Sequence, residues 1–162
     1  MKLNFNKQKN TYLLLFFYLL LLSFAFYSLQ DAGIHIEEKF HRLNGLYWLS
    51  YVSEVLGFSN LHDISSEKAS EISDFSLSSV ILYNKYGIIF DLPTAFLEIF
   101  LGINDIKSVY YLKHFLSFSI FLLSSFAFYK ILIKRYNNFL LSFVGTSLFI
   151  TTPRIFGDSF FY

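Results

Sequence analysis

The uncharged run from Tyr12 to Leu29 constrains this chain more than any other part of its sequence. It consists mostly of Leu, Phe and Tyr, and it is just long enough to cross the hydrocarbon core of a bilayer as a helix. Three lysines and no acid precede it, and the first acid is Asp31. Because positive charge is retained on the cytoplasmic side, we predict that residues 1–11 are cytoplasmic and that residues 12–29 form the first membrane span.

The same run also suits a secretory signal peptide, since Ser23-Phe24-Ala25 has the small residues of a cleavage site. An uncleaved anchor is favoured because the apolar run continues beyond Ala25 as far as Leu29. Both alternatives predict that the residues after this run are exported.

The composition agrees with a membrane protein and excludes several other classes. Residues are 54% hydrophobic, 22% aromatic and only 15% charged, which is too apolar for a typical soluble domain. Cysteine is absent, which excludes disulfides and thiolate metal sites. The net charge of +1 argues against a nucleic-acid-binding protein, which would show a clustered basic surface.

Two later apolar runs predict further spans. Residues 109–129 are mostly apolar and precede three basic residues, so this second span should run inward, in agreement with the first. Residues 130–138 then form a cytoplasmic turn around Asn137-Asn138, and residues 139–156 return outward as a third span. The predicted fold class is therefore all-α, with three membrane helices, one large outer loop and a short outer segment at 157–162.

The predicted outer loop, residues 30–108, carries eleven of the twelve carboxylates. Apolar residues spaced three and four apart predict an amphipathic helix over residues 40–56. Its apolar stripe consists of Phe40, Leu43, Tyr47, Tyr51 and Val55, and it is widened by Leu46, Leu49 and Leu56. Trp48 and the tyrosines suit a position at the level of the lipid headgroups.

Two further helices are expected in this loop. Residues 60–79 are rich in Ser and acids, which predicts a capped polar helix or a turn that faces water. Residues 91–102 predict a short helix with Pro93 in its first turn and a glycine at its end. At this length it cannot span a membrane, so we expect Phe96, Ile99 and Phe100 to face lipid or protein at the interface.

A charged cluster, residues 33–42, follows the first span. Its acids Glu37 and Glu38 allow two interpretations, a helix N-terminus that favours negative charge or a site of chemistry. His35 and His41 are candidate metal ligands with these acids, because Glu38-x-x-His41 has the spacing of one half of a di-metal carboxylate site. The chain holds no second pair of this kind, so both histidines are interpreted as bystanders.

Other polar residues have simple structural interpretations. Lys113 and His114 lie near the outer end of the second span and are expected to snorkel to the headgroups, with binding of a lipid phosphate as the alternative. Asp91 is expected to cap the helix that follows it, and Tyr86-Gly87 to form a turn.

Four short motifs occur in order along nearly the whole chain. They are Glu37-Glu38, Tyr86-Gly87-Ile88-Ile89-Phe90-Asp91, Tyr111-Leu112-Lys113-His114 and Thr152-Pro153-Arg154-Ile155-Phe156-Gly157. With the order of spans and loop, they resemble the N-terminal part of the GT-C class of membrane glycosyltransferases, of the glycosyltransferase family 39 and protein O-mannosyltransferase-like type. In that class the acidic pair is usually Asp-Glu, so Glu37 is one methylene group longer than the residue it replaces.

This resemblance implies transfer of a hexose or pentose from a polyprenyl-phosphate donor to an acceptor hydroxyl on the outer face of the membrane. It implies Glu37 as the base that takes the hydroxyl proton and Glu38 as its support. Arg42, Lys39 and Arg154 are the candidates for contact with the donor phosphate. A divalent metal ion is an alternative for neutralising that phosphate.

Members of the class run several times longer than this chain, which ends at Phe160-Phe161-Tyr162 without a polar tail. The sequence therefore predicts an N-terminal fragment in the bacterial plasma membrane that is inactive alone, with the bilayer and the lipid-linked sugar as its partners. The rival interpretation is a non-catalytic accessory membrane protein whose acidic outer loop binds a partner. A transporter fragment is disfavoured because the ionisable residues lie at the ends of spans.

Overall fold

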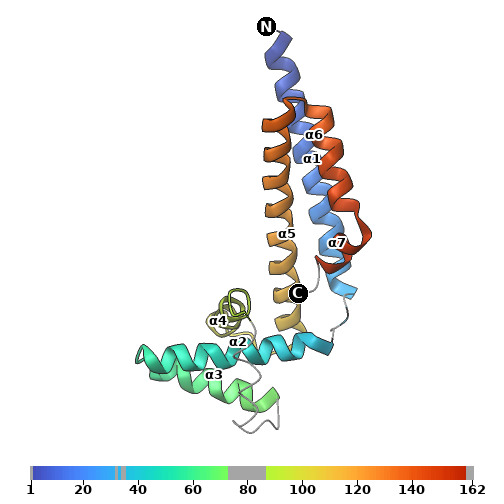
Figure 1. The fold of residues 1–162 in the computed structure, drawn as a ribbon. Coiled ribbons are helices and arrows are strands. Elements are labelled where there is room, and N and C mark those ends of the chain that lie inside the picture. The colour runs from blue at the N-terminus through green and yellow to red at the C-terminus, as the bar shows by residue number, and fades with distance from the viewer. Residues whose placement is uncertain (1, 32, 34–35, 73–86, 160–162) are drawn as a thin grey trace. The chain divides into compact units, whose positions relative to one another are not determined.

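The computed structural model describes residues 2–31, 33, 36–72 and 87–159 of the chain. Over these ranges all regular secondary structure is α-helical, which confirms the predicted class for this part of the chain. The helices are α1 (Lys2–Asp31), α2 (Ile36–Val55), α3 (Ser59–Ile72), α4 (Asp91–Phe100), α5 (Ile106–Tyr136), α6 (Phe139–Thr151) and α7 (Pro153–Asp158) (Figure 1). They form two compact units, one of residues 1–33 with 114–162 and one of residues 34–113, and the division falls within α5.

Among the residues that the structure describes, two helices are long and apolar enough to cross a membrane. They are the 22 residues Gln8–Leu29 of α1 and the 31 residues Ile106–Tyr136 of α5, against about 20 residues that a span requires. These helices contain the predicted first and second spans, residues 12–29 and 109–129. Many of their large apolar side chains are exposed, as lipid-facing helices require.

The predicted third span, residues 139–156, is not confirmed and stays a prediction. Helix α6 has 13 residues, a length of about 20 Å, whereas the hydrocarbon core is about 30 Å thick. The helix stops at Thr152, which is extended with φ −60° and ψ 116°. A residue before proline is disfavoured in the helical region, and Pro153 then begins α7.

In the unit of residues 1–33 and 114–162, aromatic side chains fill the spaces between helices. The ring of Phe17 on α1 lies 5.1 Å from that of Phe143 on α6, and Phe128 on α5 lies 4.9 Å from Phe149 on α6. The hydroxyl of Tyr18 shares a hydrogen bond of 3.1 Å with that of Ser125. Edge-on and tilted aromatic pairs of this kind add to the stability that burial alone provides.

In the unit of residues 34–113, α2 packs against both α3 and α4. Leu46 and Leu49 of α2 and Ala95 of α4 form the buried apolar core, which Leu61, Ala69, Ile72 and Ile99 surround. Gly45 allows α2 to approach α4 closely. A Cβ atom at this position would lie 2.8 Å from the carbonyl carbon of Asp91 and 3.2 Å from the Cβ of Ala95.

The face that α2 buries matches the predicted apolar stripe only in part. Leu43, Leu46 and Leu49 are buried as predicted, whereas Tyr51 and Val55 are 50% and 67% exposed. The buried face also includes the polar side chains of Glu38, Arg42, Asn44 and Ser53 beside the leucines. The leucine part of the stripe is confirmed, and the buried face extends to polar residues because Arg42 and Asn44 pair with Glu98 and Asp91 of α4.

The other loop helices match their predicted limits where the structure describes them. Helix α3 corresponds to the predicted polar helix as far as Ile72, and the remaining predicted residues, 73–79, lie outside the described residues. Tyr86 of the predicted turn and His35 also lie outside them. Helix α4 covers most of the predicted 91–102 and is followed by Gly102, whose φ of +63° suits glycine.

The side chain of Asp105 caps the start of α5. Its Oδ2 accepts hydrogen bonds from the backbone N–H of Ser108 at 3.0 Å and from the Ser108 hydroxyl at 2.9 Å. These bonds satisfy a backbone donor that the first turn of a helix leaves unpaired. Both bonds favour the ionised carboxylate and lower the pKa of Asp105 below its ordinary value.

Candidate functional site

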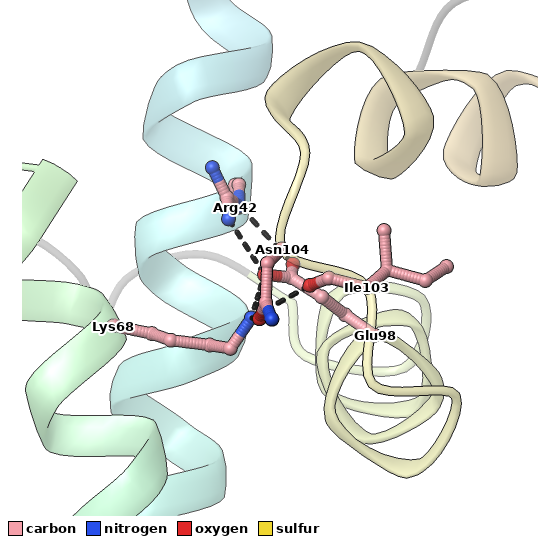
Figure 2. Close-up of polar contacts among 5 residues, drawn as sticks. All are labelled: Arg42, Lys68, Glu98, Ile103 and Asn104. Carbon is pink, nitrogen blue, oxygen red and sulfur yellow. Dashed lines mark hydrogen bonds and ion pairs between the residues drawn. The ribbon is translucent and has the colours of Figure 1, made fainter.

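The Glu98 carboxylate is the centre of the polar contacts between α2, α3 and α4. Glu98 lies on α4 and is fully buried, and the Arg42 guanidinium of α2 makes two hydrogen bonds to its carboxylate (Figure 2). Arg42 donates from Nη2 to Oε1 at 2.6 Å and from Nε to Oε2 at 3.1 Å. A bidentate pair of this kind fixes the orientation of both side chains as well as their separation.

Lys68 of α3 reaches the same carboxylate and the chain segment that follows α4. Its Nζ lies 3.5 Å from Oε1 of Glu98 and donates to the backbone carbonyl of Ile103 at 2.7 Å and to Oδ1 of Asn104 at 3.1 Å (Figure 2). An ammonium group has three protons, so these contacts use its donors fully. Lys68 therefore ties α3 to the connection between α4 and α5.

Asp91, at the first position of α4, is held by α2. Its Oδ2 accepts from Nδ2 of Asn44 at 2.6 Å and lies 3.2 Å from Nδ1 of His41. The expectation that Asp91 caps its helix was wrong, because the residue at the cap position is Phe90 and no side chain makes a cap hydrogen bond. The carboxylate instead accepts a hydrogen bond from Asn44 of α2, which lies 47 residues earlier in the sequence, and so it links α4 to α2.

Two more buried charges complete the arrangement. Glu38 of α2 is fully buried, and Lys113 near the start of α5 is 1% exposed. Lys113 interacts electrostatically with Asp91, Glu98, Arg42 and Glu38. The expectation that Lys113 snorkels to the headgroups was therefore wrong, because its side chain is buried within the protein.

These six residues form what we call the buried charge network. Its members are Glu38, Arg42, Lys68, Asp91, Glu98 and Lys113. Three carboxylates and three cations balance one another, as burial of charge requires. Since the desolvation of ions offsets their attraction, such a network adds little net stability, whereas removal of one partner is strongly destabilising.

The predicted site residues divide between this network and the surface. Glu38 and Arg42 belong to the network, whereas Glu37 and Lys39 lie exposed in the same first turns of α2. Arg154 lies in α7, in the other unit, with its side chain 92% exposed and 3.8 Å from the Asp158 carboxylate. One turn of α2 thus presents an exposed carboxylate and an exposed ammonium beside a buried carboxylate.

The sequence offers His35 and His41, with Glu37 and Glu38, as candidate metal ligands. Over the residues that the structure describes, no group of three or more carboxylate and imidazole side chains is arranged to hold a metal ion. His41 instead contacts Asp91, and His35 lies outside the described residues.

Sequence reasoning missed Glu98, Lys68 and Asp91 as partners of Arg42 and its neighbours. A signal for Glu98 was present, because it is the one acid inside the apolar segment Ala95-Phe96-Leu97-Glu98-Ile99-Phe100. Charged residues are almost never fully buried unless they are paired. The identity of the partner, 56 residues away in sequence, had no comparable signal.

Comparisons with known proteins do not identify the chain. No family model matches it, and no curated protein or solved structure matches it either. Function has to be inferred from the residues and their geometry.

Proposed function

We propose that this chain is the N-terminal part of a membrane glycosyltransferase of the GT-C class, moving a sugar from a polyprenyl-phosphate donor to an acceptor hydroxyl. In this proposal the N-terminus is cytoplasmic, residues 30–108 lie on the outer side, and residues 139–156 form a third span. Support comes from the order of the four motifs and from the two helices that are long and apolar enough to cross a membrane.

The observation that carries the proposal is the contrast between two adjacent carboxylates. Glu37 is exposed and Glu38 is completely buried, although both lie in the first turn of α2. A general base must lie within about 3 Å of the oxygen whose proton it removes, so it needs an accessible carboxylate. It also needs a rigid support, which the buried charge network supplies through the neighbouring Glu38 and Arg42 of the same helix.

The proposed reaction is a single displacement at the anomeric carbon of the donor sugar. The acceptor oxygen forms a bond to that carbon while the bond from the carbon to the phosphate oxygen breaks. Glu37 takes the proton of the acceptor hydroxyl, and the polyprenyl phosphate leaves with the bonding electrons. Base catalysis by a positioned carboxylate contributes about 10²- to 10⁴-fold to reactions of this type.

The departing phosphate needs a cation. Lys39 is the cation of the first turns of α2 with an exposed side chain, and Arg154 is an exposed cation of α7. Arg42 would have to leave Glu98 to bind a phosphate, so its role in this proposal is to hold α2 in position. A divalent metal ion remains a second way to neutralise the leaving group.

The proposal is tested with Glu37→Gln, which removes the basic charge and keeps the shape of the side chain. Membranes that contain the protein, expressed from its complete reading frame, receive a radiolabelled polyprenyl-phosphate hexose or pentose. Label transferred to the envelope acceptors is then counted. Glu54→Gln is the matched control, since Glu54 is an exposed glutamate near the other end of the same helix.

We expect Glu37→Gln to lower the initial rate at least a hundredfold, while Glu54→Gln leaves it unchanged. Glu37→Asp, which has the residue usual in the family, should retain transfer. Equal rates for wild type and Glu37→Gln would refute the assignment of the base. If the wild-type protein transfers neither sugar, the proposal fails in favour of an accessory protein whose acidic loop binds a partner.

A further inference from the structure

Helix α4 has its polar side toward the protein and its apolar side outward. Asp91 and Glu98 are the charged residues of Asp91–Phe100, and both are buried in the network with α2. The opposite side presents what we call the apolar face of α4, formed by Pro93, Phe96, Phe100 and Leu101. A helix on the surface of a water-soluble protein shows the reverse arrangement.

The apolar face of α4 is built from large side chains. Phe100 is 73% exposed and Phe96 is 43% exposed, and their rings stack with centroids 5.9 Å apart. Leu101 continues the face at the end of the helix and is also more than half exposed. An apolar face without charge requires an apolar environment, which either lipid or another protein can provide.

The position of α4 in the chain favours lipid. Only residues 101–105 separate it from α5, which is long and apolar enough to span a membrane. Five residues reach at most about 17 Å, so the end of α4 must lie close to the level where α5 enters the bilayer. Lys68 restrains this connection further through its hydrogen bonds to Ile103 and Asn104.

We infer that the apolar face of α4 lies in the membrane interface, with Phe96 and Phe100 inserted among the lipid headgroups and the first part of the acyl chains. Helices of this type bury their apolar side about 5–10 Å into the boundary between headgroups and acyl chains. Helix α3, by contrast, exposes the acids Asp63, Glu67 and Glu71 and faces water. The buried charge network then holds a lipid-bound helix and a water-facing helix on the two sides of α2.

The test uses the natural absence of cysteine, which makes every introduced cysteine unique. The full chain with Phe100→Cys is spin-labelled and reconstituted in phosphatidylcholine and phosphatidylglycerol vesicles at a high ratio of lipid to protein. Collision of the label with oxygen, which concentrates in lipid, is compared with collision with a water-soluble nickel chelate. Leu123→Cys on α5 serves as the lipid control and Glu67→Cys on α3 as the water control.

We expect the oxygen-to-nickel collision ratio at position 100 to exceed that at position 67 at least several-fold and to approach that at position 123. Phe96→Cys should behave in the same way, which guards against a local effect of one substitution. A ratio equal to that at position 67 would overturn the inference. Low collision with both reagents would also overturn it, because it would show that protein covers this face. Neither result depends on whether Glu37 is a base.

Discussion

Removal of the Glu98 carboxylate should destabilise the unit of residues 34–113 far more than a typical substitution. The change Glu98→Leu puts an apolar side chain of similar size in place of the carboxylate, and it removes both hydrogen bonds that Arg42 makes with Glu98. Arg42 is only 6% exposed, so its charge would remain buried without this partner. Loss of one partner of a buried ion pair costs about 3–5 kcal/mol.

The double variant Arg42→Met with Glu98→Leu gives the decisive comparison. It removes both charges together, and replacement of a buried pair by apolar side chains is often neutral or stabilising. We therefore expect it to recover most of the stability that Glu98→Leu loses. The coupling free energy between the two positions should be at least about 2 kcal/mol, near the upper part of the range for residues in contact.

Trp48 provides the assay, because it is the only tryptophan of the chain and lies in α2. Its emission is followed during urea unfolding of the full protein in detergent micelles. With a slope of about 2 kcal/mol per molar urea, a loss of 4 kcal/mol lowers the midpoint by about 2 M. Glu67→Leu, an exposed acid of α3, should move it by less than about 0.3 M, since surface substitutions stay within about 0.5 kcal/mol.

The reasoning would be refuted by strict additivity, in which the double variant loses the sum of the two single losses. It would also be refuted if Glu98→Leu lowered stability no more than Glu67→Leu. Either result would mean that solvent or another side chain satisfies Arg42 when Glu98 is absent.

Three further predictions follow from individual contacts. Gly45→Ala should destabilise α2 against α4 by about 1–3 kcal/mol in the same urea assay, because its Cβ would overlap backbone atoms. Gly87→Ala is the control, since its Cβ would meet no atom within 4 Å. The lowered pKa of Asp105 stabilises α5 above pH 3.8, and this contribution should disappear as the pH falls through the lower folded value. The protection of the amides at the start of α5, relative to the intrinsic exchange rate at each pH, should therefore fall in acid, and Ser108→Ala should weaken that pH dependence. A topology reporter fused after Arg135 should read as cytoplasmic, and an external signal would refute the proposed orientation.

Sequence patterns predicted the elements whose cause is local. The uncharged run of residues 12–29 and the second apolar run both lie in long helices, because length and composition alone decide whether a helix can span. Pro93 and Gly102 likewise set the limits of α4. The break at Thr152 also has a local cause, since proline follows it, but the apolar composition of residues 139–156 hides that break.

The buried charge network could not be predicted because its cause is distant in sequence. Hydrophobic periodicity treats Glu38 and Arg42 as solvent-facing, although α4 and α5 bring carboxylates and an ammonium group to them. The same assumption led to the expectation that Lys113 reaches the headgroups. A charged residue can be buried where a residue of opposite charge pairs with it, and the pattern of a single sequence does not show which distant residues come into contact.

The separation of Arg42 and Glu98 in sequence has a consequence for biogenesis. A chain grows at about 5–20 residues per second, so Glu98 is made roughly 3–11 s after Arg42, which lies 56 residues earlier. During this interval the guanidinium has no carboxylate from α4 and must stay hydrated. Helix α2 therefore cannot complete its packing as it emerges, and its docking has to wait until α4 has been synthesised.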